Sequence, residues 1–250
     1  MGELAQKAQV SIEIVSPNGA RSATRGWAMN ICIGSRWVGK WSYLLPEDEH
    51  QDDPLRQWER LTPAALAVFD RLFSDRLLQC PLFLTLWEIG RPPQFTRSVV
   101  EQWKFVTPTI SSLLTGVRQW GTLDIHGSSV IASPLGERAL QGVLGLTVAA
   151  ESFGNSISIW TRSDVWMPYD LQARPHPEVA ALNAPRLKAA LEAVERMLGV
   201  TALSEDTRFA KVDGYELRNH TAFGDVLDLQ DMGYDESWIA ERWPDPDPVT

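Results

Sequence analysis

Asp124 and His126 are the two residues of this sequence whose types and spacing come closest to catalytic chemistry. They stand two apart in a stretch of alternating apolar and polar residues, so both side chains are expected on the same face of a strand. Ser128 and Ser129 follow, and an aspartate, a histidine and a serine are the groups of a hydrolase triad. A hydrolase or transferase that uses Asp124 and His126 is therefore one hypothesis. The alternative is a polar strand edge that leads into a turn.

The spacing motifs of the common enzyme classes are absent from the sequence. It contains neither the glycine-rich loops of nucleotide-binding sites nor the GxSxG and HExxH motifs of hydrolases. Cys32 and Cys80 stand far apart, without a neighbouring cysteine or a histidine pair, which predicts two buried thiols. We therefore predict a protein that is not an enzyme and that uses no cofactor and no metal.

The net charge of −9 is concentrated in two acidic segments. Residues 54–220 carry equal numbers of acidic and basic groups, whereas residues 221–250 carry eight acidic groups and one basic group, Arg242. The shorter segment surrounds His50, and because its spacing does not fit a calcium loop, it is interpreted as a solvent-exposed acidic loop. Binding to nucleic acid requires a basic stripe, so no direct contact with nucleic acid is predicted. The acidic residues of the shorter segment are Glu47, Asp48, Glu49, Asp52 and Asp53.

The longer acidic segment also contains aromatic residues, which acidic tails that serve only solubility lack. Aromatic anchors combined with clustered carboxylates are typical of a docking surface for a basic protein. The alternative is that Trp238 and Trp243 hold this segment against the body of the protein while the acids face water. The predicted partner-binding residues are Asp225, Asp228, Asp231, Asp235, Glu236, Trp238, Glu241 and Trp243, assisted by the acids of residues 47–53.

Residues 155–199 contain the strongest secondary-structure signals. Ile157 and Ile159 alternate with serines, which is the period of a strand with one buried face. From Asn183 the period becomes helical, and Gly199 stands where a left-handed helix cap belongs. Because the helix and the strands each have one apolar side, we expect the helix to lie across the sheet. The apolar residues of its predicted face are Leu187, Leu191, Val194 and Leu198.

The remaining elements complete an α+β pattern. Strands are expected at residues 10–15, 27–33, 36–45 and 80–89, and several more between residues 121 and 170, with a small helical insert at 136–140. Thr62 and Thr107 each precede a proline and are expected to begin helices. A hairpin at Asp213-Gly214 and a short helix at residues 237–243 are also predicted. We predict a single domain over residues 1–250 with mostly antiparallel sheet and about three helices packed on one face. Two similar halves, about 1–120 and 121–250, are the alternative.

No apolar run approaches the roughly 20 residues that cross a bilayer. The first residues also lack the basic and apolar organisation of a secretion signal. We therefore expect a cytoplasmic protein without membrane contact.

The general composition resembles that of the immunity proteins encoded beside bacterial polymorphic toxins. The chain is acidic, rich in tryptophan and free of enzyme motifs, and its segments 166–170 (Trp-Met-Pro-Tyr-Asp) and 183–187 (Asn-Ala-Pro-Arg-Leu) are similar to segments of such proteins. The resemblance implies an inhibitor that binds a cognate toxin and blocks its active site. In such inhibitors, carboxylates often occupy the positions in which a nuclease toxin would hold the phosphates of its substrate. The sequence-based hypothesis is thus a protein that neutralises a basic toxin, plausibly a nuclease.

Overall fold

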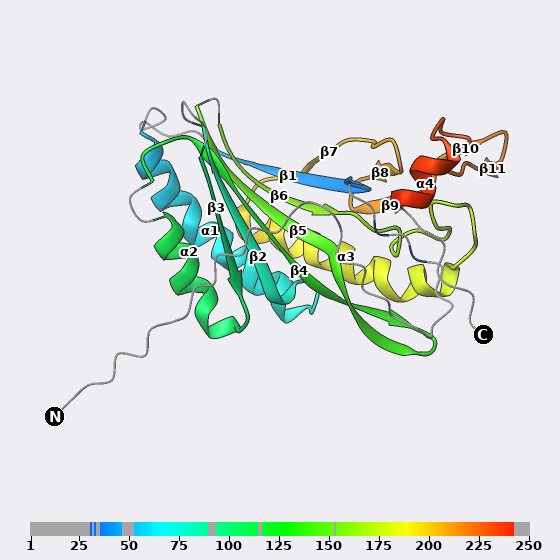
Figure 1. The fold of residues 1–250 in the computed structure, drawn as a ribbon, viewed down its shortest axis with the longest axis horizontal. Coiled ribbons are helices and arrows are strands. Elements are labelled where there is room, and N and C mark those ends of the chain that lie inside the picture. Colours follow the sequence, from blue (N-terminus) through cyan, green and yellow to red (C-terminus); the bar gives the residue numbers. More distant parts are fainter. Residues whose placement is uncertain are drawn as a thin grey trace.

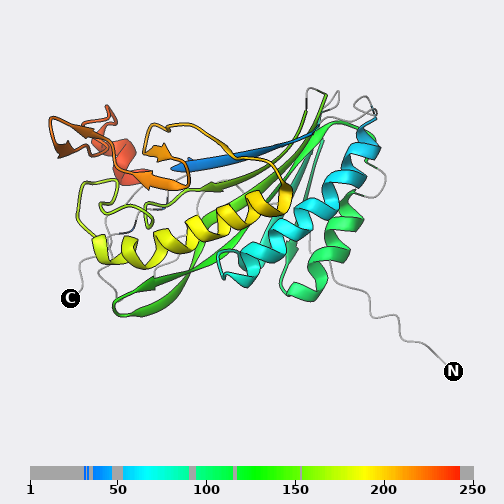
Figure 2. The same ribbon diagram turned by 180° about the vertical axis from the view of Figure 1, so that it is seen from behind.

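The centre of the fold is a seven-stranded antiparallel sheet with the strand order β3-β2-β4-β5-β6-β1-β7. The computed structural model describes residues 31, 33, 36–46, 53–89, 94–114, 117–152 and 154–242. Three helices, α1, α2 and α3, cover one face of the sheet, as Figures 1 and 2 show from opposite sides. The predicted α+β class with mostly antiparallel sheet is therefore confirmed.

The strands of this sheet come from both halves of the chain, because β1 lies between β6 and β7. The strands are β1 (Gly39–Leu45), β2 (Gln79–Glu88), β3 (Gln94–Val100), β4 (Gly121–Ser133), β5 (Gly136–Glu151), β6 (Gly154–Thr161) and β7 (Leu203–Ser204). The helices that cover the sheet are α1 (Pro54–Ser74), α2 (Val106–Leu114) and α3 (Pro177–Leu198), with the short 3-10 turn η1 (Trp103–Phe105) before α2. The C-terminal part adds β8 (Lys211–Asp213), β9 (Glu216–Arg218), β10 (Thr221–Ala222), β11 (Asp225–Val226) and α4 (Glu236–Arg242).

The core lies between the sheet and the helices. Ile157 and Ile159 of β6 are fully buried, as the alternation predicted, and they stand opposite Val148 and Leu146 of β5. On the other side of β6, Tyr43 of β1 is also fully buried, and its hydroxyl donates to the carbonyl of Leu191 in α3 at 3.0 Å. The sheet therefore presents one continuous apolar face to the helices.

Helix α1 begins nine residues before the predicted position, so the expectation of a cap at Thr62 was wrong. The Asp53 carboxylate accepts from the backbone N–H groups of Leu55 and Arg56, and Pro54 occupies the first turn. Thr62 lies inside the helix, where its hydroxyl donates to the carbonyl of Trp58 at 2.6 Å. Asp53-Pro54 and Thr62-Pro63 are both typical helix starts. The helix begins at the first of them, because Trp58 and Leu61 then add to its buried face.

Helix α3 also begins earlier than predicted, at Pro177 instead of Asn183. Asn183 is fully buried in the second turn of the helix, and its amide donates to the carbonyls of Val179 and Ala132. Its oxygen accepts from the N–H of Ala132 in β4, so the side chain ties the helix to the sheet instead of capping it. At the other end Gly199 adopts φ 69°, which confirms the predicted left-handed cap.

The predicted helical insert at residues 136–140 was wrong, because this segment is the first part of β5. Ser133 pairs with Gly136, and the pairing of β4 with β5 then continues to Gly121 and Ala150. A long-range strand partner thus overrides a weak local signal. The hairpin predicted here is confirmed between β8 and β9, but its turn lies one residue later than predicted, at Gly214 and Tyr215, because Asp213 pairs with Glu216.

Two expected strands cannot be placed. The strand at residues 10–15 lies outside the described residues, and so does that at 27–33 apart from Ile31 and Ile33. Within the part of the chain that the structure describes, no helix combines the length and apolar character needed to cross a membrane.

We expect Asn183→Ala to lower the free energy of unfolding by about 2 kcal/mol, because the backbone groups of Ala132 lose their partner. Urea denaturation measures this change. Leu182→Ala is the matched control, since Leu182 is the preceding residue of the same helix and is 44% exposed. Equal, small effects of the two substitutions would contradict the anchoring role of Asn183.

Candidate functional site

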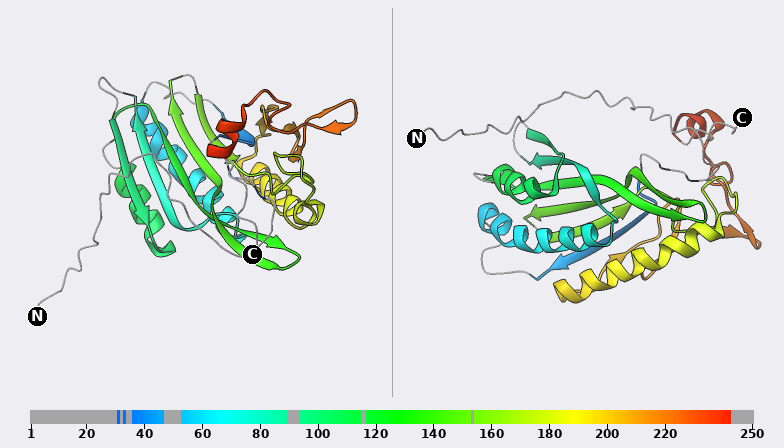
Figure 3. Two further views of the ribbon diagram at one scale, coloured as in Figure 1. Left: turned by 45° about the vertical axis from the view of Figure 1, so that its right-hand side comes forward. Right: turned by 90° about the horizontal axis from the view of Figure 1, so that it is seen from below.

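The predicted docking residues of the C-terminal segment gather at one end of the molecule. Helix α4 and the small β10–β11 hairpin lie beyond the β8–β9 hairpin, far from β3 at the opposite end of the sheet, as Figures 1 and 3 show. Leu229 is buried, and its N–H donates to the carbonyl of Leu171 in the body of the protein. The segment is thus a folded unit attached to the sheet.

Three of the predicted acids stabilise turns of this unit. Asp228 and Asp231 each accept a hydrogen bond from the backbone N–H of the other, at 2.8 and 3.1 Å. Asp235 caps α4 by accepting from the hydroxyl of Ser237 and the N–H of Trp238. These two donors, the Ser237 hydroxyl first, lower the pKa of Asp235 below its usual value. The sequence pattern could not separate these capping roles from partner binding.

The aromatic residues of the segment pack on each other. The ring of Trp238 stacks on Tyr234 at a centroid distance of 4.3 Å, and Tyr234 stacks on Phe209 at 5.6 Å. Trp238 is half-buried, and its ring contributes to the packing of the segment. Trp243 lies outside the described residues.

Five predicted acids are exposed on the surface of this unit. None of them forms an ion pair with a side chain among the described residues, so their charge is available to a partner. They are Asp225, Asp231, Asp235, Glu236 and Glu241.

A hollow of about 320 Å³ lies at the foot of α4. Asp228 and Glu236 contribute carboxylates to its wall, while Leu229 and Ile239 contribute apolar surface. No sequence pattern indicates this hollow, because residues 228–230 and α4 form it together. Its remaining lining residues are Gln172, Gln230 and Ala240.

Of the acids of residues 47–53, the structure describes only Asp53. Glu47, Asp48, Glu49 and Asp52 lie outside the described residues. Asp53 caps α1 and lies 3.5 Å from the guanidinium of Arg56. The start of α1 and helix α4 are at opposite ends of the molecule (Figures 1 and 2), so Asp53 does not assist the C-terminal acids.

Asp124 and His126 lie on the same face of β4, as their spacing predicted, and this face is opposite the helices. Asp124 accepts a hydrogen bond from the hydroxyl of Thr147 at 2.5 Å, and that hydroxyl accepts from the indole N–H of Trp160 at 3.0 Å. The ring of His126 stacks on Phe83 at 5.3 Å and contacts Trp160 at 6.4 Å. These neighbours come from three other strands, so only the register of the sheet reveals them.

Burial controls the ionisation of this cluster. It lowers the pKa of His126 to about 4, and the guanidinium of Arg162 adds to this effect. Burial also raises the pKa of Asp124, which the hydrogen bond from Thr147 and the charge of Arg162 partly oppose. The guanidinium of Arg162 lies over the ring of Trp160 at 4.5 Å. The imidazole is therefore neutral at pH 7.

The described residues do not assemble the imagined Asp–His–Ser triad. The hydroxyl of Ser129 is buried and donates to the carbonyl of Leu77 at 2.6 Å, and that of Ser128 donates to Gln141 at 2.8 Å. Asp124 is bonded to Thr147 and not to His126. No group of three or more metal-ligating side chains occurs within the described part of the chain.

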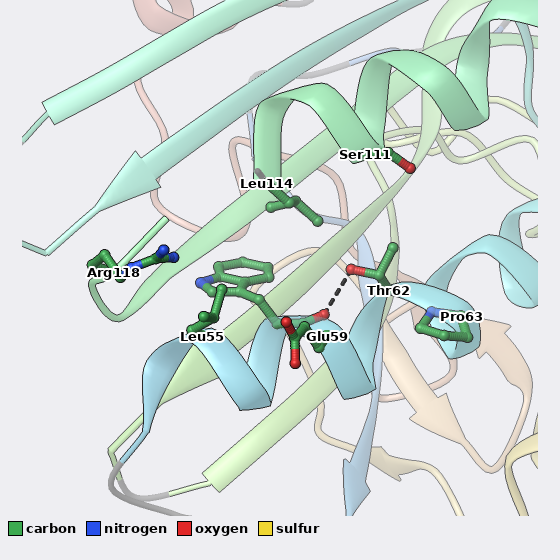
Figure 4. Close-up of a pocket in the computed structure, with 8 residues that line it drawn as sticks. Leu55, Glu59, Thr62, Pro63, Ser111, Leu114 and Arg118 are labelled. Carbon is green, nitrogen blue, oxygen red and sulfur yellow. Dashed lines mark hydrogen bonds between the residues drawn. The ribbon is translucent and has the colours of Figure 1, made fainter. Parts of the chain in front are cut away.

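A second hollow, of about 460 Å³, opens between α1 and α2 (Figure 4). Trp58 and Leu114 form its apolar part, and Glu59 and Arg118 stand at its margin. Pro63 lacks an N–H, so the carbonyl of Glu59 has no helical donor from that position. None of the residues predicted to bind a partner or to act in catalysis lines this hollow.

Comparisons with models of protein families, with curated proteins and with solved structures find no match to this chain. The geometry of the molecule is therefore the basis for its functional interpretation.

The lowered pKa of His126 predicts how the stability of the protein depends on pH. The unfolded chain binds a proton on this residue below about pH 6.5 and the folded chain only below about pH 4. Stability is therefore expected to fall as the pH falls from about 6.5 to 4, by on the order of 3 kcal/mol from this group.

Urea denaturation over this range, beside the variant His126→Gln, measures the contribution. The variant is expected to lose that part of the pH dependence. An NMR titration in which the His126 ring protonates near pH 6.5 in the folded protein would contradict the prediction.

Proposed function

We propose that this chain is a binding protein that neutralises a basic toxin, such as a nuclease, by covering its active site with the acidic C-terminal unit. The observation that supports this proposal best is the hollow beside α4. A lysine or arginine of a partner could lay its aliphatic stem on Ile239 and place its charge between Asp228 and Glu236. The exposed acids around it would speed the encounter.

The internal hydrogen bonds of the unit favour this function. The reciprocal bonds of Asp228 and Asp231 and the cap at Asp235 fix the carboxylates before a partner arrives. A surface that is already ordered loses less conformational entropy on binding than a flexible acidic tail does. The aromatic stack of Trp238 on Tyr234 adds to this order.

The hydrolase hypothesis has weaker support. A general base near neutral pH should titrate near its working pH, whereas His126 has a pKa of about 4, stacks on Phe83 and lies beside the tilted ring of Trp160. Both serines next to it are engaged in other hydrogen bonds. The cluster around Asp124 is thus better explained as a polar network that orders the sheet.

A pull-down from the native host with the tagged chain, at low and high salt, tests the function. The expected result is one basic protein that is retained at low salt, that arrests growth when it is expressed alone and that is harmless when this chain is co-expressed. A retained protein without toxicity, or toxicity that the chain does not relieve, would contradict the proposal.

Charge reversal tests the surface separately. We expect Asp225→Lys, Glu236→Lys and Glu241→Lys together to slow association with the captured toxin by about tenfold or more and to weaken its salt dependence. These three acids form no cap, so the fold of the unit is preserved. Association rates from biosensor measurements at several salt concentrations provide the test.

The matched control reverses three exposed acids elsewhere, Glu59, Asp70 and Glu205, which changes the net charge equally. If both triple variants slow association to the same extent, the net charge is responsible and the C-terminal unit is not the docking surface.

A further inference from the structure

The two edges of the main sheet differ in how they are protected. Strand β7 at one edge has two residues, whereas β3 at the other has seven, and no described strand pairs with its outer side. Exposed edges are usually protected by shortness, proline, lysine or a bulge, because their free backbone groups pair with other strands. Within Gln94–Val100, β3 contains no proline and a single charged residue, Arg97, and it pairs with β2 without a register shift.

Apolar side chains extend to this edge on the face of the sheet opposite the helices. Phe95 is 59% exposed, Val99 is 47% exposed, and Trp87 of β2 is 44% exposed. Phe95 stands directly opposite Trp87, with the ring centroids 5.5 Å apart. Exposed aromatic residues grouped in this way mark interaction surfaces.

The charge distribution permits a second copy of the chain to approach this edge. The strands β2 and β3 contain one acid, Glu88, and one base, Arg97. The acidic C-terminal unit, which would repel its equivalent, lies at the other end of the molecule (Figures 1 and 3). Two copies that meet at β3 therefore keep their acidic ends apart.

We propose that two copies of this chain form a symmetric dimer in which their β3 strands pair antiparallel, with Thr96 at the two-fold axis. A two-fold axis makes two copies of one strand antiparallel, which is the pairing used throughout the sheet. An axis at Arg97 would set two guanidinium groups opposite each other, which is unfavourable. With the axis at Thr96, Arg97 faces Phe95 of the second copy, and within one chain it already lies over that ring at 5.3 Å.

Sedimentation of the full chain over a wide range of concentration tests the dimer. The expected mass is twice 28.0 kDa. Phe95→Lys, which places a charge at the edge, is expected to weaken dimerisation by about tenfold or more. Leu203→Lys is the matched control, because Leu203 is 56% exposed on the other edge strand, and it should leave the dimer intact.

A monomer at all concentrations would overturn the dimer, and a dimer that Phe95→Lys leaves intact would overturn its assignment to β3. Neither result depends on the toxin, so these experiments test the dimer independently of the proposed function.

Oxidative crosslinking tests the register. With Cys32 and Cys80 replaced by serine, Thr96→Cys is expected to form a disulfide between copies, because residues paired at the axis have Cα atoms about 4.5–5.5 Å apart. Ser98→Cys is the control. Residue 98 of one copy is opposite residue 94 of the other, so the two Cα atoms of residue 98 are about 13 Å apart along the strands. A crosslink through Ser98→Cys and not through Thr96→Cys would overturn the proposed register.

Discussion

The docking of α3 across the sheet is the interaction on which the rest of the structure depends. Asn183 bonds both backbone groups of Ala132, and the guanidinium of Arg186 donates to the carbonyls of Val130 and Asp75. One helix therefore holds the C-terminal ends of β4 and α1 in fixed positions. Because these polar groups are buried or half-buried, their hydrogen bonds specify a single position for the helix, while the apolar contacts supply most of the free energy.

The sequence predicted the fold where a local signal and the tertiary environment agree. Gly199 and Gly214 are such positions, because both have a positive φ, 69° and 59°, which glycine adopts more readily than other residues. The helix starts were misplaced where one residue type serves two purposes. Thr62 and Asn183 are common caps, but both satisfy their polar groups inside helices, and only their long-range neighbours decide between these roles.

The candidate sites were predictable to a similar extent. The spacing of Asp124 and His126 placed them on one face, but the residues that set their ionisation come from other strands. Thr147 lies in β5 and Trp160 in β6. The sequence does not show which residues of β4 stand beside them, because that depends on the register of strand pairing. In the C-terminal unit, composition identified the acids but not their division into capping residues such as Asp235 and residues that face only water.

The two proposed surfaces use different physical interactions, and this difference makes their coexistence in one molecule reasonable. Exposed carboxylates act over about a Debye length, roughly 8–10 Å at physiological salt, so they accelerate an encounter but are screened as salt increases. Apolar edge pairing is short-ranged and is not screened in this way. A strongly acidic chain that associated through its acidic end would repel itself. Self-association at the neutral β3 edge avoids that repulsion, and it would leave two acidic units at the far ends of a dimer, each free to bind a partner.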